Sequence, residues 1–389
     1  MLFRHKRKTG AGPAANLQIL RRHIMHGTKS PWALIPMLYG IFFCCCADRN
    51  GDTVSTLKEK QQIPDHFEIV TEIAIKTNKN SRGFWEALID GGHTLVYIPA
   101  GAFTMGSDKG LSNEQPVHKV YLDGYWLSKY PVTVAQFRSF VEEKDYVTDA
   151  EKGQGSWQFW QGRWVVRYDG NWKNPYFDQE MDHPVVSISW NDAVTFCRWL
   201  SAKTDLPIKL PTEAQWEKGA RGKDERMFPW GNEIPDGSKA NYADLNFWKK
   251  YADSRTADKS IDDGYVETSP VGSFPAGASP YGLLDMAGNV WEWCYDVFQE
   301  DYYSVSPYKN PIGPRGKGSP DQNRVNRGGG SWTDRSGHIT PVGGHNLRSA
   351  ARTGDEQNSS DDHMGFRLCI DMSSRYEDLE TASAARNLP

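Results

Sequence analysis

The sequence predicts an α+β fold, built as a single loop-rich domain with few helices and short antiparallel strands. Its 389 residues include 36 glycines, 15 tryptophans and 17 tyrosines, which is typical of tight turns held by large aromatic anchors. Long apolar helical runs are scarce, which argues against a helix bundle or a doubly wound sheet. Beyond residue 222 the pattern consists of turns, aromatic residues and short strands.

Composition divides the chain into four ranges. They are a leader at 1–47, a polar linker and lead-in at 48–93, one domain at 94–371 and a polar tail at 372–389. The net charge of −4 and the pI near 6.2 give no electrostatic case for a nucleic-acid partner, because that needs a clustered positive surface.

The leader has the pattern of an export signal. Basic residues between positions 21 and 29 precede the apolar run "PWALIPMLYGIFFCCCA", which is shorter than the roughly 20 residues that span a bilayer. The run ends in Cys44, Cys45 and Cys46, and one of these thiols can carry a lipid, as in bacterial lipoproteins. We therefore expect an exported lipoprotein, membrane-anchored in the cell envelope or at the cell surface. An uncleaved apolar anchor is the alternative, and Met25 is an alternative start to Met1.

Outside the leader the chain has three cysteines, Cys197, Cys294 and Cys369. Three thiols in an oxidising compartment allow one disulfide at most and leave one thiol over. No cysteine and histidine spacing of the structural zinc type occurs.

The domain opens with segments that predict strands. "TLVYIPAGAFTMGSD" (94–108) reads as two strands joined by a Pro-Ala-Gly turn, and hence as a hairpin. "HKVYLDGYWLSKYPV" (118–132) predicts two further strands that break at Asp123-Gly124.

Three helices follow, and the first and third start at a recognisable cap. Thr133 with Gln136 forms a capping box before an apolar helical face, and Thr212 with Gln215 repeats it before a stop at Gly222. Between them, "SWNDAVTFCRWLSAKT" (189–204) has helical periodicity, with Cys197 on its apolar face.

Seven segments in fixed order resemble the formylglycine-generating enzyme (sulfatase-modifying factor) family. They are "IPAGAFTMGS" (98–107), "HPVVSISWNDAVTFCRWLS" (183–201), "LPTEAQWEKGARG" (210–222), "FPWGN" (228–232), "YGLLDMAGNVWEWCYD" (281–296), "RVNRGGGSW" (324–332) and "GFRLC" (365–369). The resemblance implies a compact mixed α/β fold of the C-type-lectin kind, which agrees with the composition.

The resemblance also implies an oxidation reaction at a copper ion, but this sequence lacks the metal ligands for it. Active members oxidise a cysteine of a client sulfatase to formylglycine, using oxygen and a copper ion held by two cysteines after the "GGS-aromatic" turn. Copper(I) prefers soft thiolate ligands. Here Asp334 stands at the first thiol position, and no cysteine occurs between 335 and 346. Ser331 matches a pocket residue of the family. We therefore expect no copper and no catalytic residue, although an oxidase with atypical ligands remains the alternative, so whether the chain is an enzyme stays open.

Two sets of residues match calcium sites of the family, so the resemblance implies structural calcium. Their carboxylates and carbonyl oxygens are the hard ligands that calcium prefers. The first set is Asp285, Gly288, Val290 and Glu292, and the second is Asn241, Tyr242, Asp263 and Tyr265.

A polar segment at 333–363 lies between the apolar anchors Trp332 and Phe366. Its side chains Asp334, His338, His345, Asp361, Asp362 and His363 lack tight spacing, so we expect a solvated loop here rather than a replacement metal site. On a lectin-like fold such a loop can present side chains to a partner. The sequence therefore favours a binding or scaffold protein whose protein or glycan ligand is unknown. A structural envelope lipoprotein of a secretion or motility apparatus is a further alternative.

Overall fold

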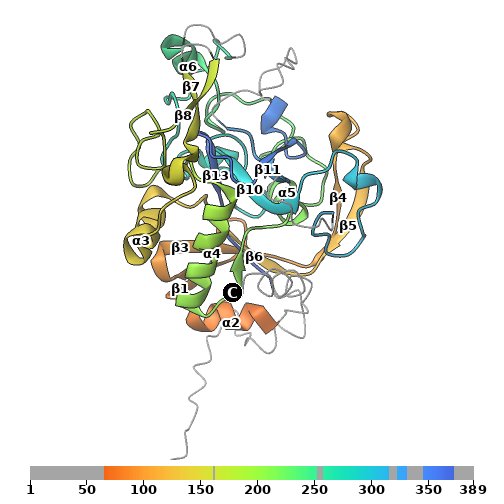
Figure 1. Cartoon of the computed structure of the whole chain (residues 1–389). Helices are drawn as coiled ribbons and strands as arrows, with labels where there is room; N and C mark the ends of the chain where they lie inside the picture. The colour runs from red at the N-terminus through yellow and green to blue at the C-terminus, as the bar shows by residue number, and fades with distance from the viewer. Residues whose placement is uncertain (1–64, 161–162, 252–256, 315–321, 331–344, 372–389) are drawn as a thin grey trace, which may run out of the picture. The chain divides into compact units, whose positions relative to one another are not determined.

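The computed structural model of this protein describes residues 65–160, 163–251, 257–314, 322–330 and 345–371 (Figure 1). The predicted leader, with Cys44, Cys45 and Cys46, and the polar tail lie outside these residues. Among the described helices, none is both long enough and apolar enough to cross a membrane.

The largest sheet has six strands, and all its neighbouring pairs are antiparallel. In spatial order the strands are β1 (Lys76–Lys79), β2 (Trp85–Ile89), β3 (His93–Ile98), β6 (Tyr125–Ser128), β14 (Cys369–Ile370) and β9 (Ile208–Lys209). Strand β14 comes last in the sequence, yet it pairs with β6 on one side and with β9 on the other. The end of the domain is therefore built into the interior of this sheet.

A second sheet has four strands and carries the C-terminal half of the domain. Its order is β12 (Arg352–Glu356), β11 (Asn323–Arg327), β10 (Trp291–Val297) and β13 (Met364–Phe366). Strands β10 and β13 are parallel, with Trp291 opposite Met364. A separate hairpin consists of β7 (Ser156–Trp160) and β8 (Arg163–Arg167). The short strands and long connections confirm the predicted α+β, loop-rich fold.

The hairpin predicted over 94–108 is wrong in its pairing. Both strands exist, as β3 and β4 (Gly101–Met105), but β3 pairs with β2 and β6. Strand β4 instead forms a hairpin with β5 (His118–Leu122). Gly101 has φ +143°, a backbone conformation that glycine adopts readily and other residues rarely do. It lies where the chain passes from the six-stranded sheet to the β4–β5 hairpin. An apolar pattern predicts a strand but not the strand it pairs with. Here β3 and β4, although adjacent in the sequence, do not pair with each other.

The range 48–93, expected as linker and lead-in, contains regular structure from residue 65 onward. Helix α2 (Asp65–Ile73) precedes β1 and β2, which both join the main sheet. The ring of Phe67 in α2 stacks on Trp126 at a centroid distance of 5.5 Å. Strand β1 resembled a linker because it is a largely exposed edge strand of sequence Lys-Thr-Asn-Lys. The folded part therefore begins before residue 94.

The three predicted helices are confirmed as α3 (Val134–Lys144), α4 (Trp190–Thr204) and α5 (Glu213–Arg221). All three have a capping box, and in the first Thr133 Oγ1 accepts a hydrogen bond from Gln136 N at 3.3 Å. The sequence does not predict α6 (Leu245–Lys250), which is too short to show periodicity. Short 3-10 or π turns lie at Asp90–Gly92, Ser112–Glu114, Ala150–Gln154, Pro275–Gly277, Tyr302–Ser304 and His345–Leu347.

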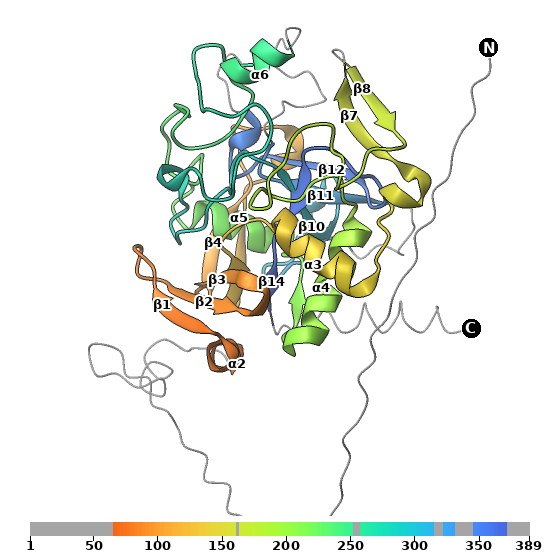
Figure 2. The ribbon, with the colours of Figure 1, turned by 90° about the vertical axis from the view of Figure 1, so that its left-hand side faces the viewer.

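Helix α5 is buried along its whole length, between the second sheet and the β4–β5 hairpin (Figure 2). Its two acidic residues are paired with arginines of the neighbouring strands. Arg352 Nε donates to Glu213 Oε1 at 2.6 Å, and Arg327 pairs with Glu217. These four side chains are at most 1% exposed. Because a buried charge is costly without a partner, the pairs fix where the helix sits against β11 and β12.

Asp296 of β10 lies beside this network, and we expect it to make stability depend on pH. Burial, and next the Glu213 carboxylate, raise the pKa of Asp296 from 3.8 to about 8. A carboxyl whose pKa is raised on folding stabilises the protein fully below the unfolded pKa, and that contribution disappears as the pH rises to the folded pKa. Between about pH 4 and pH 8, unfolding therefore releases one proton from this group, and stability falls by up to about 1.4 kcal/mol per pH unit.

The variant Asp296→Asn removes this group and leaves the other titrating carboxyls in place. Urea unfolding at pH 5 and at pH 7 should show a smaller loss of stability between the two pH values in Asp296→Asn than in the wild type. Equal pH dependence in the two proteins would contradict the assignment.

Candidate functional site

The first predicted calcium set lies in the turn that leads into β10. Asp285 has φ +54° and Gly288 has φ +80°, so the backbone turns tightly before the strand. Asp285 Oδ2 accepts a hydrogen bond from Gly272 N at 2.7 Å, and the Gly288 carbonyl accepts one from Val290 N at 2.9 Å. Burial raises the pKa of Asp285 to about 6. The turn is therefore buried, and its oxygens accept hydrogen bonds from backbone N–H groups.

Glu292, the fourth member of this set, is already bound by a cationic side chain. Arg367 Nε and Nη2 donate to its two oxygens at 2.6 and 2.7 Å, and Trp216 Nε1 donates to Oε2 at 2.7 Å. The fully buried Arg367 also donates to the carbonyls of Ser128 and Leu284. The Arg367 guanidinium already balances the negative charge of Glu292. A calcium ion is therefore less strongly favoured at this carboxylate than the sequence position predicts. The first set remains a prediction.

The second predicted calcium set comes together around Asp263. Its oxygens accept hydrogen bonds from Tyr242 N and Tyr265 N, both at 2.9 Å. Burial raises the pKa of Asp263 to about 7. Asn241 Nδ2 donates to Glu267 O at 2.6 Å, but no donor among the described residues reaches the buried Asn241 Oδ1. A desolvated carboxylate and an acceptor that lacks a donor are both stabilised by a bound cation, so these residues fit calcium.

Asp361, Asp362 and His363 lie together in the interior, between β12 and β13. His363 Nδ1 is 2.8 Å from Asp361 Oδ1 and 3.0 Å from Asp362 Oδ1. The three residues are only 3%, 3% and 6% exposed, so the expectation of a solvated loop is wrong at these positions. The reason is a parallel bridge between Asp361 and Trp157, which holds this stretch against β7. Asp334 and Ser331 lie outside the described residues.

The charges of this cluster depend on one another. Burial raises the pKa of Asp362 to about 7. Burial alone would lower the pKa of His363, but the neighbouring Asp361 and Asp362 carboxylates raise it to about 9. Sequence reasoning named these residues without seeing that they are buried. The available signal was the immediate adjacency of Asp-Asp-His to the apolar segment that starts at Met364.

The three cysteines of the domain are buried and unbridged. Cys197 lies on α4, Cys294 in β10 and Cys369 in β14. Burial raises the pKa of all three thiols. Cys369 Sγ is 3.5 Å from Gln215 Oε1, in the core. These sulfurs therefore serve as apolar packing groups.

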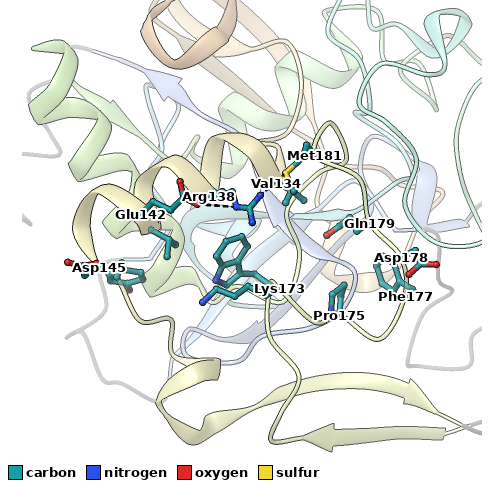
Figure 3. A pocket seen from close by; sticks show the side chains of 13 residues that line it. Val134, Arg138, Glu142, Asp145, Lys173, Pro175, Phe177, Asp178, Gln179 and Met181 are labelled. Atoms are coloured by element: carbon teal, nitrogen blue, oxygen red, sulfur yellow. Dashed lines mark hydrogen bonds and ion pairs between the residues drawn. The ribbon is translucent and has the colours of Figure 1, made fainter. Parts of the chain in front are cut away.

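A pocket with a volume of about 630 Å³ lies between α3 and the loop at 172–181 (Figure 3). Arg138 and Glu142 of α3 form an ion pair at 3.2 Å on one wall. Gln179 and Met181 belong to the loop, and Met181 Sδ lies 3.7 Å from Arg138 Nη1, so loop and helix meet at that end of the pocket. No residue of the two predicted calcium sets lines this pocket.

Comparison with known proteins places this chain in one class of domain. The sulfatase-modifying factor enzyme 1-like domain matches residues 89–372. The formylglycine-generating enzyme of Mus musculus is 34% identical over 308 residues, which cover 71% of this chain and 75% of the mouse protein. The inactive Cα-formylglycine-generating enzyme 2 of Bos taurus is 30% identical over 302 residues, covering 70% and 86%.

Among solved structures, PvdO from Pseudomonas aeruginosa superposes with a TM-score of 0.57 at 24% identity, covering 77% of this chain and 99% of PvdO. That likeness concerns the fold. The domain match and the curated relatives establish that this chain belongs to the sulfatase-modifying factor family, as its seven ordered segments predict.

Proposed function

We propose that this protein is a member of the family that lacks thiol–copper oxidase activity and acts as a binding or scaffold module. The observation that carries the proposal is the loss of the thiol pair: Asp334 stands at the first thiol position, and residues 335–346 contain no cysteine. The proposal includes export and membrane anchoring through the N-terminal leader, which rest on the pattern of residues 1–47.

The remaining thiols of the domain do not provide a substitute pair. A copper(I) ligand must be a thiolate, and a catalytic one must be reachable by the substrate. Cys294 and Cys369 are 0% exposed, Cys197 is 2% exposed, and burial raises the pKa of each. They therefore remain protonated and enclosed. The bovine relative, which is described as inactive, supports the view that the fold persists in this family without the oxidase reaction.

The oxidase assay tests this proposal directly. The purified protein is incubated with copper, a reductant, oxygen and a peptide that contains the Cys-x-Pro-x-Arg motif, and the peptide is analysed by mass spectrometry. The mouse formylglycine-generating enzyme is the positive control. We expect the peptide mass to stay unchanged with this protein and to fall at the cysteine with the mouse enzyme. Product formation with about one equivalent of bound copper would overturn the proposal.

The partner surface that we propose is the segment 333–363, with a protein or glycan as its ligand. In its described part, Asn346 and residues 353–359 are at least partly accessible, and Glu356 is the exposed residue at the end of β12. A glycan array probed with the wild type and with Glu356→Lys tests this surface. Binding that the substitution weakens, while Glu225→Lys on another exposed turn leaves it intact, supports the proposal. Equal binding by all three proteins would place the ligand elsewhere.

We further propose that calcium braces the second set of residues, Asn241, Tyr242, Asp263 and Tyr265. Removal of calcium with a chelator should lower the melting temperature of the wild type, since a ligand at 100 times its Kd stabilises by about 2.7 kcal/mol. Asp263→Asn keeps the side-chain shape but removes the charge, so this variant should melt at the same temperature with and without calcium.

The matched control for this experiment is Asp224→Asn, an exposed carboxylate paired with Arg226. It should keep the full response to calcium. A wild type whose melting temperature ignores the chelator would contradict calcium binding. A response that survives in Asp263→Asn would move the ion to the first set, around Asp285.

A further inference from the structure

We propose that Asp361, Asp362 and His363 bind a divalent first-row transition-metal ion, at a site separate from both calcium sets. One ligand atom from each residue lies within 4.8 Å of the other two, and all three residues are buried. The ligand set is one imidazole nitrogen and two carboxylate oxygens, which suits Mn²⁺, Fe²⁺ or Zn²⁺ better than a monovalent soft ion.

The spacing of the ligand atoms supports this assignment. Ligands bonded at about 2.1 Å to one ion, at right angles to each other, lie about 3.0 Å apart, a value that follows from ordinary metal–nitrogen and metal–oxygen distances. His363 Nδ1 lies 2.8 Å from Asp361 Oδ1 and 3.0 Å from Asp362 Oδ1. The nitrogen therefore lies at the separation from each oxygen that a shared ion requires. The same two distances are those of hydrogen bonds between Nδ1 and the carboxylates, so the ion would take the place of the Nδ1 proton.

Outer contacts hold the ligands in this arrangement, as they do around established metal sites. Asp362 Oδ2 accepts a hydrogen bond from Phe159 N at 3.3 Å, which leaves Oδ1 directed at His363. The buried Gln158 amide, oriented to satisfy its surroundings, donates to the same Oδ2 at 3.1 Å. The ring of Trp164 packs on the His363 imidazole at a centroid distance of 5.0 Å.

The backbone around the cluster is equally fixed. Asp361 O accepts hydrogen bonds from Ser187 N at 2.9 Å and from Met364 N at 3.1 Å. A Cβ atom at Gly330 would lie 3.4 Å from His363 Cβ, so the start of the "GGSW" turn runs alongside the histidine. The ion would thus tie together the β7 hairpin, the entry to β13 and the glycine turn. The apolar surroundings strengthen its attraction to the two carboxylates.

Metal analysis of the full chain tests the site. The purified protein is stripped with a chelator, returned to excess calcium so that hard-ion sites are filled, loaded with Zn²⁺ or Mn²⁺, and freed of unbound metal by gel filtration. We expect about one equivalent of the transition metal in the wild type. Asp361→Asn, Asp362→Asn and His363→Gln should each weaken its affinity by about 100-fold or more, since even outer-shell changes weaken metal affinity by about 10–100-fold.

Two control variants separate this site from the rest of the protein. His183→Gln removes a comparably buried imidazole, which bonds Thr268 at 2.8 Å and has no part in the cluster, so it should keep the metal. Asp263→Asn removes the proposed calcium site and should also keep it. Failure of calcium binding is thereby distinguished from failure of the transition-metal site, and neither outcome depends on the oxidase assay.

If the ligand variants do not fold, spectroscopy on the wild type can still identify the metal ligands. Mn²⁺ bound at this site should show coupling to one imidazole nitrogen, and X-ray absorption of bound Zn²⁺ should show nitrogen and oxygen ligands without sulfur. A wild type that retains no transition metal in excess calcium would overturn the proposal. So would bound metal with no imidazole ligand, or folded Asp361→Asn and Asp362→Asn variants that bind as the wild type does.

Discussion

Replacement of Arg367 with methionine should lower the free energy of unfolding by about 3–5 kcal/mol, the usual cost of removing one partner of a buried ion pair. Arg367 is fully buried, and two of its nitrogens bind both oxygens of Glu292. Without the guanidinium, the Glu292 carboxylate stays in the interior and keeps, among the described residues, the hydrogen bond from Trp216 Nε1. Urea or guanidinium unfolding of the two proteins measures the difference.

Two further variants show whether the pair itself is responsible. Arg138→Met removes an arginine whose side chain is 50% exposed and whose partner Glu142 is 69% exposed. That change should cost less than about 1 kcal/mol, as is usual for surface pairs. The double variant Arg367→Met with Glu292→Leu should recover part of the loss, because no buried charge is then left alone. Equal losses in Arg367→Met and Arg138→Met would refute this account of Arg367.

Replacement of Phe196 with alanine should cost about 3–5 kcal/mol, the range for emptying a large aromatic position in a core. Phe196 is 0% exposed. Its ring lies 5.2–5.9 Å, between centroids, from the rings of Phe137, Phe140, Trp199 and Phe366. These residues belong to α3, α4 and β13, so the cavity would open where two helices meet a strand of the second sheet.

A shift of the denaturation midpoint without a change in slope would confirm that only stability is affected. Val305→Ala provides the control, since Val305 is 70% exposed and its truncation should change stability by at most about 0.5 kcal/mol. A loss below about 1 kcal/mol in Phe196→Ala would mean that the cluster repacks around the missing ring.

Local signals predicted α3, α4 and α5 but not α2 and α6. A capping box is complete within four residues, so Thr133 with Gln136 and Thr212 with Gln215 could be recognised without knowing the fold. Strand partners depend on residues far away in the sequence, and for that reason the hairpin expected over 94–108 was wrong. The polar edge strand β1 gave no apolar pattern at all, so it resembled a linker.

The candidate site was only partly visible in the sequence. The resemblance named Asn241 and Asp263, and the structure brings them to one place. It gave no indication that Arg367 neutralises Glu292, because an ion pair across 75 residues leaves no local pattern. The burial of His363 likewise depends on a contact with β7, which lies about 200 residues earlier in the chain.

The position of β14 has a consequence for how the protein is made. Cys369 and Ile370 form hydrogen-bonded pairs with β6 and β9, strands that leave the ribosome more than 150 residues earlier. During translation, the edges of β6 and β9 that pair with β14 have no partner until the final segment has been synthesised. Unpaired strand edges of this kind favour slow folding and association between nascent chains. A transcript truncated shortly before codon 369 would therefore yield a chain with a gap between β6 and β9 in its largest sheet, and the cell's quality-control proteases should remove it.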